Sequence, residues 1–217
     1  MRSSRRMGDS AAAAEGWLVE GERVALARPD REAFISRWDC YDDPRIAMVA
    51  AFQTAGATPI LKPPVTREHR EALWEAVADG RLVALDVHTV DDGRFVGEAG
   101  LARIAWPKGW ADVAAALFDP ADRGHGYGTE AVVLLCAYGF DALGLNRMSI
   151  RYLSVNEAVT RAVERSAASV GARVVGIERE AEWAYGARRD RLLVEVLRED
   201  FPGHPATAHL RGSLNAT

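Results

Sequence analysis

The sequence predicts an α+β fold in which helices flank a central mixed, mostly antiparallel β-sheet. Segments with strand and helix periodicity alternate in a mixed order, and two pairs of strand-like segments are joined by short turns typical of antiparallel hairpins. At 217 residues, with 48% hydrophobic and 27% charged residues, the chain has the size and composition of a single globular domain.

The first half of the chain is expected to supply two helices and a hairpin. Asp30 follows a strand-like segment and begins a helical stretch whose apolar residues share one face. Thr66 is a helix cap, and Gly80 ends the helix that follows it. The turn at 90–94 joins two strands as a hairpin. The elements expected here are a strand at 22–29, helices at 31–43 and 67–79, and strands at 81–90 and 94–105.

The second half is expected to contain two more helices and a closing hairpin. Val132, Leu135, Cys136 and Phe140 repeat at helical spacing. The exposed edge of the last hairpin is the candidate surface for pairing in a homodimer. The elements expected here are a strand at 111–119, helices at 129–143 and 156–171, a strand at 146–155, extended chain at 172–180, and a hairpin with arms at 180–186 and 191–199.

Three parts of the chain differ in composition. Residues 1–16 are small, polar and without periodicity, so they are expected to form a disordered leader. Residues 17–200 form the predicted domain. Residues 201–217 contain two prolines and two glycines, which predict a mostly irregular C-terminal tail.

Charge and cysteine usage exclude several classes of function. A net charge of -4 argues against a sequence-independent grip on nucleic acid. No apolar run approaches the roughly 20 residues that span a bilayer, so neither a membrane partner nor a signal peptide is expected. Cys40 and Cys136 lack disulfide or metal spacing, and His69 and His88 are isolated. We therefore expect reduced thiols, no metal and a cytoplasmic location.

The most informative segment is the glycine turn at residues 123–128, Arg-Gly-His-Gly-Tyr-Gly, between a predicted strand and a predicted helix. Glycines allow a tight turn with uncovered N–H groups, and the helix directs its positive end at the same point, which suits a pyrophosphate. No Gly-Lys-Ser/Thr follows, and the Rossmann spacing is absent, so nucleotide hydrolysis and hydride transfer are disfavoured. A glycine-rich connection without a ligand is the alternative.

At this turn the sequence resembles the GNAT acetyltransferases, whose signature R/Q-x-x-G-x-G/A is matched by Arg123, Gly126 and Gly128. It looks closest to the branch that includes the ribosomal-protein N-terminal acetyltransferases, over about residues 20–200. The matching positions include the GYGTEA run at 126–131 and, at the start of the next helix, Asn156, Arg161, Ala162 and Glu164.

The resemblance implies a GNAT-like sheet that splays between the fourth and fifth predicted strands and holds acetyl-CoA or another acyl-CoA there as co-substrate. It implies that Phe118 and Asp119 present main-chain groups to the pantetheine arm and that Asn156 reaches the arm near the thioester. The residues implied to meet the pyrophosphate are Arg123, Gly124, His125, Gly126, Tyr127, Gly128 and Thr129. The acyl group would pass by direct attack, in a ternary complex, to a primary amine of a small molecule or a protein N-terminus.

The sequence departs from the family where a proton carrier is usual. A typical member has a glutamate on the strand before the glycine turn and a tyrosine on the helix after Asn156, where this chain has Val113 and Val163. The substitutes considered as catalytic residues are Asp112, Glu98 and Tyr152. Each is also compatible with a purely structural role, and backbone amides with water are the alternative source of catalysis.

Two further functions stay open. The two valines favour a GNAT-fold protein that binds an acyl-CoA without ordinary transfer. A repurposed biosynthetic enzyme that uses the acyl-CoA slot for another reaction is the third reading. For acyl transfer, the leading function, the segment at about 39–66 is expected to form part of the acceptor cleft.

Overall fold

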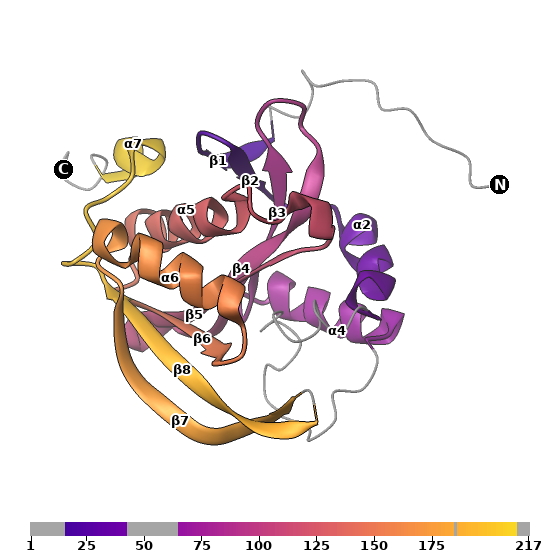
Figure 1. The fold of residues 1–217 in the computed structure, drawn as a ribbon. Coiled ribbons are helices and arrows are strands. Elements are labelled where there is room, and N and C mark those ends of the chain that lie inside the picture. The colour runs from indigo at the N-terminus through magenta and orange to yellow at the C-terminus, as the bar shows by residue number, and fades with distance from the viewer. Residues whose placement is uncertain (1–15, 43–64, 185, 212–217) are drawn as a thin grey trace.

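The chain forms an eight-stranded mixed sheet with helices on both faces, as described by a computed structural model for residues 16–42, 65–184 and 186–211 (Figure 1). The strand order is β1-β2-β3-β4-β5-β6-β8-β7, and every neighbouring pair is antiparallel except β5 and β6. The predicted α+β class is confirmed. The strands are β1 Trp17–Glu20, β2 Val24–Ala27, β3 Val83–Thr89, β4 Phe95–Ala105, β5 Trp110–Leu117, β6 Arg147–Leu153, β7 Arg173–Ala184 and β8 Ala187–Leu197.

Most helices fall where the sequence predicts them. The expected helix at 31–43 is divided, because only its first turn and a half is α-helical and the rest is a 3₁₀ helix. The α-helices are α2 Arg31–Ser36, α4 Arg67–Ala78, α5 Tyr127–Asp141, α6 Glu157–Val170 and α7 Ala208–Arg211. The 3₁₀ helices are η1 Arg37–Asp42, η3 Trp106–Lys108, η4 Pro120–Asp122 and η5 Pro205–Thr207.

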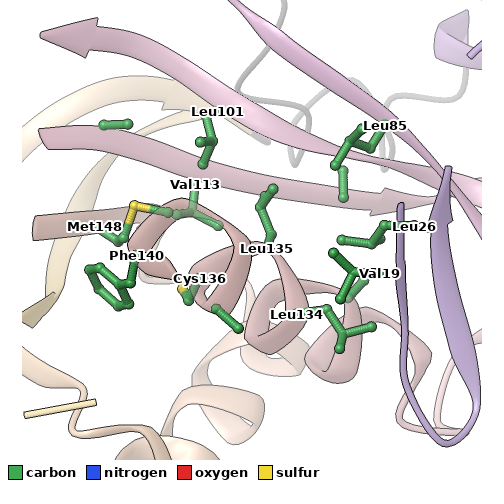
Figure 2. Close-up of a cluster of buried hydrophobic side chains, with 14 of the residues drawn as sticks. Val19, Leu26, Leu85, Leu101, Val113, Leu134, Leu135, Cys136, Phe140 and Met148 are labelled. Atoms are coloured by element: carbon green, nitrogen blue, oxygen red, sulfur yellow. The ribbon is translucent and has the colours of Figure 1, made fainter. Parts of the chain in front are cut away.

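Helix α5 packs on one face of the sheet and forms the main core there. Leu134, Leu135 and Phe140 of α5 are buried against apolar side chains of β1 to β6, as Figure 2 shows for the residues around Val113. Burying side chains of this size typically contributes about 1.5–3 kcal/mol each. Gly139 lets the helix approach β6, since a Cβ there would collide with Met148. We call this side of the sheet the α5 face.

Helices α2 and α4 cover the opposite side of the sheet, which we call the α4 face. Leu73 and Val77 of α4 contact Ala84, Ala102 and Ala114 of the central strands. Small residues on these strands let the helix lie close to the sheet. Side chains alternate between the two faces along a strand. On each of these strands, a residue two or four positions from one of these alanines therefore also points to the α4 face.

The only parallel pair in the described sheet separates partway along its length. Pairing between β5 and β6 ends at Val113 and Ile150, although β5 continues to Leu117 and β6 to Leu153. Beyond that point β5 stays paired with β4, and β6 with β8. The β6-facing backbone edge of residues 114–117 therefore has no strand partner within the described chain. We call this opening the split; it is the splay that the resemblance implies.

Two segments form regular or packed structure where the sequence pattern predicts no regular element. Strand β1 precedes the first predicted strand and pairs with β2. The segment after β8, expected to be irregular, packs against α5: Phe201 lies 5.3 Å from the ring of Phe140, and Thr207 donates a hydrogen bond to Asp141 at 2.6 Å. Thr207 is fully buried, so contacts with α5 hold this segment in place although its composition predicts irregular chain.

Strand β7 forms one edge of the sheet. The two extended segments expected at 172–186 join into this single strand, which is interrupted by two bulges. Val174, Val175 and Ile177 are more than half exposed on it. Bulges and charged residues are common features of strand edges that avoid pairing with other chains. Homodimer formation at this edge stays a prediction.

Candidate active site

The glycine turn lies at the open end of the split. Strand β5 ends at Leu117, the chain passes through η4, and the turn then leads into α5. Gly124 and Gly126 both have φ of +86°, a left-handed conformation that other residues adopt at a cost. The two glycines therefore set the direction in which the helix begins.

The N-terminus of α5 is a potential anion site. Gly126 is the N-cap and has no side chain to accept a hydrogen bond, so within the described residues the N-cap side chain leaves the N–H groups of the first helical turn uncapped. A 15-residue helix adds a partial positive charge at this end. Around it, Arg123, Gly124, His125 and Gly126 are exposed, and the His125 ring stacks on Tyr127 at 5.6 Å.

The residues that the resemblance implies for the pantetheine arm lie on the two sides of the split. Phe118 directly follows β5 and packs between Tyr41 and Phe95, at ring distances of 5.3 and 5.7 Å. The Asp119 carboxylate caps η4 by accepting from Ala121 N at 2.8 Å, so its side chain is used within the loop. Across the split, Asn156 follows β6 and begins α6, where its carbonyl accepts from Thr160.

An ion pair that sequence reasoning missed anchors the loop before the glycine turn. Arg94 donates to both carboxylate oxygens of Asp122, at 3.0 and 2.6 Å. Asp122 is 7% exposed at its side chain, and bidentate pairs of this kind fix orientation as well as distance. The loop is thus tied to the β3–β4 hairpin. Nothing in the local sequence could identify Arg94 as the partner, 28 residues away.

Glu130 anchors the start of α5 to the turn between β1 and β2. Its Oε1 accepts hydrogen bonds from the backbone N–H groups of Glu22 and Arg23, at 2.5 and 3.0 Å. Gly21 makes this contact possible, because a Cβ there would collide with the same carboxylate. The contact also brings the Arg23 Cδ methylene to 4.0 Å from where a Cβ on Gly126 would lie, and Arg23 Nη1 lies 3.5 Å from Glu130 Oε2. Arg23 is therefore a candidate cation for the potential anion site, and its guanidinium is paired with Glu130 in this structure.

Glu98, one of the catalytic candidates, lies in a buried network of charges on the α4 face. Arg70 donates to both of its oxygens, at 2.5 and 3.0 Å, and Tyr41 and Arg37 add hydrogen bonds of 2.5 and 3.2 Å. Arg37 also holds Asp86 on the neighbouring strand. Burial, followed by the Glu98 charge, raises the pKa of Tyr41 well above its usual value, so the phenol stays a donor. With its oxygens so occupied, Glu98 is better suited to structure than to proton transfer.

Asp112, the second candidate, also faces α4 but stands apart from Glu98. The two positions are four residues apart along β5, since Glu98 pairs with Ala116, which corresponds to about 13 Å of strand. Asp112 Oδ2 contacts Arg103 and lies 3.4 Å from Arg151 Nε. Its Oδ1 is buried and has no hydrogen-bond partner among the residues that the structure describes. An unpaired buried carboxylate oxygen is costly, so this atom is a candidate for a ligand contact.

Tyr152, the third candidate, points to the other side of the sheet. Met148 and Ile150 pack in the core under α5, and strand alternation places Tyr152 with them, whereas Arg151 contacts Asp112 on the α4 face. The structure therefore brings none of the three candidates together. Val113, where the family usually has a glutamate, is buried in the α5 core and is not near Asp112's carboxylate face.

Neither cysteine has the character of a nucleophile. Cys136 is buried in the core, and desolvation raises its pKa to about 12. Burial, followed by nearby carboxylates, also raises the pKa of Cys40. In the described residues no group of three or more His, Cys, Asp or Glu side chains is arranged to hold a metal, and no described helix is long and apolar enough to cross a membrane. Most of the expected acceptor segment, residues 43–64, lies outside the described residues.

One family of known proteins matches the sequence. A family model described as an acetyltransferase (GNAT) domain matches residues 23–168. No curated protein sequence matches the chain significantly.

Similar solved structures share the fold at low sequence identity. They include a spermidine N-acetyltransferase from Vibrio cholerae in complex with CoA and spermine, with a TM-score of 0.68 and 15% identity over 82% of this chain and 96% of that one. A ribosomal-protein-S5-alanine acetyltransferase from Vibrio fischeri has a TM-score of 0.64 and 17% identity over 84% and 97%. A further structure, a probable acetyltransferase, has a TM-score of 0.65 and 18% identity over 83% and 96%.

Proposed function

Because this chain belongs to the GNAT acetyltransferase family, an N-acetyltransferase family, we propose that it transfers an acetyl group from acetyl-CoA directly to a primary amine. The observation that supports this proposal most is the position of the glycine turn, with the uncapped N-terminus of α5, at the open end of the β5–β6 split. A diphosphate and an extended amide chain need these two features side by side.

The residues present fit a CoA thioester. Gly126 leaves open space at the helix N-terminus, where the nearest side-chain atom to an added Cβ is 4.0 Å away. The unpaired edge of residues 114–117 offers peptide N–H and C=O groups to the amide groups of pantetheine. Arg123, Arg23 and the first turn of α5 supply positive charge for the phosphates.

The reaction requires a neutral amine and a proton source for the leaving thiolate. The amine nitrogen attacks the thioester carbonyl carbon, the C–S bond breaks, and the proton lost by nitrogen ends on the sulfur or in water. Asp112 lies one residue before the point where the split opens, and its Oδ1 is free to accept that proton. Of the three sequence candidates, Asp112 is therefore the one that we place in this role.

The amine class is drawn from two kinds of relative. One similar structure is a spermidine acetyltransferase and another a ribosomal-protein alanine acetyltransferase, so small amines and a protein N-terminus are both candidate acceptors here. The assay measures the free thiol released from acetyl-CoA with a panel of small amines and of peptides with free N-termini. Calorimetry with CoA gives the concentration of binding-competent protein in each assay. Thiol release with at least one amine is expected. CoA binding without release from any acceptor would favour the acyl-CoA-binding alternative, which Val113 and Val163 motivate.

Arg23→Ala is expected to weaken CoA binding by roughly five- to tenfold, about 1 kcal/mol, because it removes a cation beside the phosphate site. Isothermal calorimetry with CoA measures this effect, which should shrink as salt is raised. Arg28→Ala is the matched control: Arg28 is also an exposed arginine, but it follows the other end of β2. Equal CoA affinities of the two variants would show that Arg23 does not contribute to CoA binding.

A further inference from the structure

A cluster of charges on the α4 face is incompletely satisfied. The Asp112 side chain is 7% exposed, and within the described part of the chain its Oδ1 has no hydrogen-bond partner. Arg151 Nε, 3.4 Å from Oδ2, is also buried without a hydrogen bond. Arg103 completes the cluster by contacting Oδ2. A buried carboxylate requires a cation close by, yet here half of it is left unpaired.

Arg103 reaches Asp112 from an unusual backbone conformation. It lies in a bulge of β4 between Ala102 and Ala105, with φ of +50°. A non-glycine residue in this region carries strain, and bulges turn a side chain away from its regular direction. The bulge thus directs the Arg103 guanidinium onto a carboxylate that the regular strand would not place within its reach.

The Arg103 contact is also the more replaceable of the two. Burial lowers the pKa of the Arg103 guanidinium, and the like charges of Arg151 and Arg191 lower it further. Its side chain is 42% exposed, and such pairs contribute little to stability. Arg151 is held from the other side by Glu178 at 3.1 Å, and Glu178 in turn binds Arg191 at 3.2 Å. If Arg103 moves away, Arg151 remains beside Asp112.

The cluster lies next to the proposed point of acyl transfer. Asp112 pairs with Ser149, and the next pair, Val113 with Ile150, is the last before the split. An amine that approaches the thioester at the closed end of the split therefore passes this carboxylate. Most primary amines arrive as ammonium ions at neutral pH. Exchange of a guanidinium for an ammonium keeps the buried carboxylate paired throughout.

We propose that Arg103 occupies, in the free protein, the place of the acceptor's ammonium group on Asp112, and that a cationic primary amine displaces it on binding. This inference rests on the proposed function and specifies its acceptors as amines that bind in the charged form. The bound ammonium gives one proton to water before its nitrogen attacks, and the second proton leaves the nitrogen after attack, to Asp112 Oδ1, as in the proposed reaction. Arg103 then competes with the amine for Asp112 and is not required to hold the Asp112 carboxylate in place.

A binding experiment tests the proposal without any turnover. In Arg103→Ala the Asp112 carboxylate loses one cation, so n-butylammonium chloride is expected to raise the melting temperature above the effect of sodium chloride at the same concentration. The wild-type protein should show a smaller difference than Arg103→Ala, because the ammonium must displace Arg103, and the double variant Arg103→Ala/Asp112→Asn should show none. An ammonium effect that is absent from Arg103→Ala, or that persists in the double variant, overturns the proposal.

Kinetics give the second readout, with an amine that the wild-type protein acetylates. Arg103→Ala is expected to lower KM for that amine by about threefold or more with kcat little changed, since a competitor has been removed. If Arg103 instead supported substrate binding, Arg103→Ala would raise KM. An unchanged or raised KM therefore contradicts the proposal. Glu180→Ala is the matched control, because Glu180 has the same φ of +50° but lies in β7, and its KM should stay at the wild-type value. A wild-type protein inactive on every amine would sink the proposed function, while the ammonium effect would still decide this inference.

Discussion

Gly126→Leu is expected to abolish measurable CoA binding, a loss of at least about 100-fold or 2.7 kcal/mol, while the protein stays folded. An added side chain meets no protein atom closer than 4.0 Å at its Cβ, so it would project into the space where the helix N-terminus faces a phosphate. The left-handed φ of +86° adds a backbone strain of about 1–2 kcal/mol. Calorimetry with CoA and acetyl-CoA gives the affinity, and thermal unfolding gives the strain.

Gly144→Leu separates these two effects. Gly144 has a comparable φ of +70°, and its added Cβ would also meet nothing within 4 Å, but it follows the opposite end of α5. We expect a similar loss of stability with unchanged CoA affinity. Should Gly126→Leu bind CoA as Gly144→Leu does, the helix N-terminus would not be the phosphate site, and the proposed function would lose its main support.

Arg70→Ala is expected to destabilise the protein by about 3–5 kcal/mol, because it leaves Glu98 as a buried carboxylate with one of its two guanidinium partners gone. Arg70 is 1% exposed, donates to both Glu98 oxygens and also donates to the backbone carbonyl of Phe34 in α2. For a domain of this size the melting temperature should fall on the order of 10 °C. Urea unfolding followed by circular dichroism measures the change.

A neighbouring arginine on the same helix provides the control. Arg67 is exposed and pairs with Glu32 and Glu71 at the surface, so Arg67→Ala should leave the melting temperature almost unchanged. Glu98→Gln tests the catalytic alternative for the same network. We expect it to lower stability in parallel with Arg70→Ala; a normally stable Glu98→Gln protein with lost kcat would instead make Glu98 the catalytic base.

The sequence was sufficient for the elements whose signals are local. The repeat of Leu135, Cys136 and Phe140 is a property of one helix, and its burial follows from that spacing. The glycine turn could be found for the same reason. Gly124 and Gly126 adopt a positive φ, which is a local property of the backbone that glycine favours. The hairpin β3–β4 and the long hairpin β7–β8 likewise follow from turns of a few residues.

The boundaries that failed are those decided by distant contacts. The end of α2 at Ser36 is followed by η1, whose Arg37 and Tyr41 side chains turn toward Glu98. The C-terminal segment has prolines and glycines that predict irregular chain, yet Phe201 finds the ring of Phe140 and is held against the core. Composition indicates the conformation that an isolated segment prefers, whereas packing against the core decides the conformation that the segment adopts in the folded protein.

By itself the sequence determined the class of fold, the family resemblance and the position of the potential phosphate site, because each depends on residues that are close together in the chain. Only the tertiary structure decided which groups surround the candidate catalytic residues. Glu98 meets Arg70 from 28 residues away, Asp112 meets Arg103 through a bulge, and Tyr152 points to the other face because strand alternation places it there. The chemistry of a carboxylate is set by the charges that surround it, and those charges come from elements that are brought together only when the sheet and its helices pack.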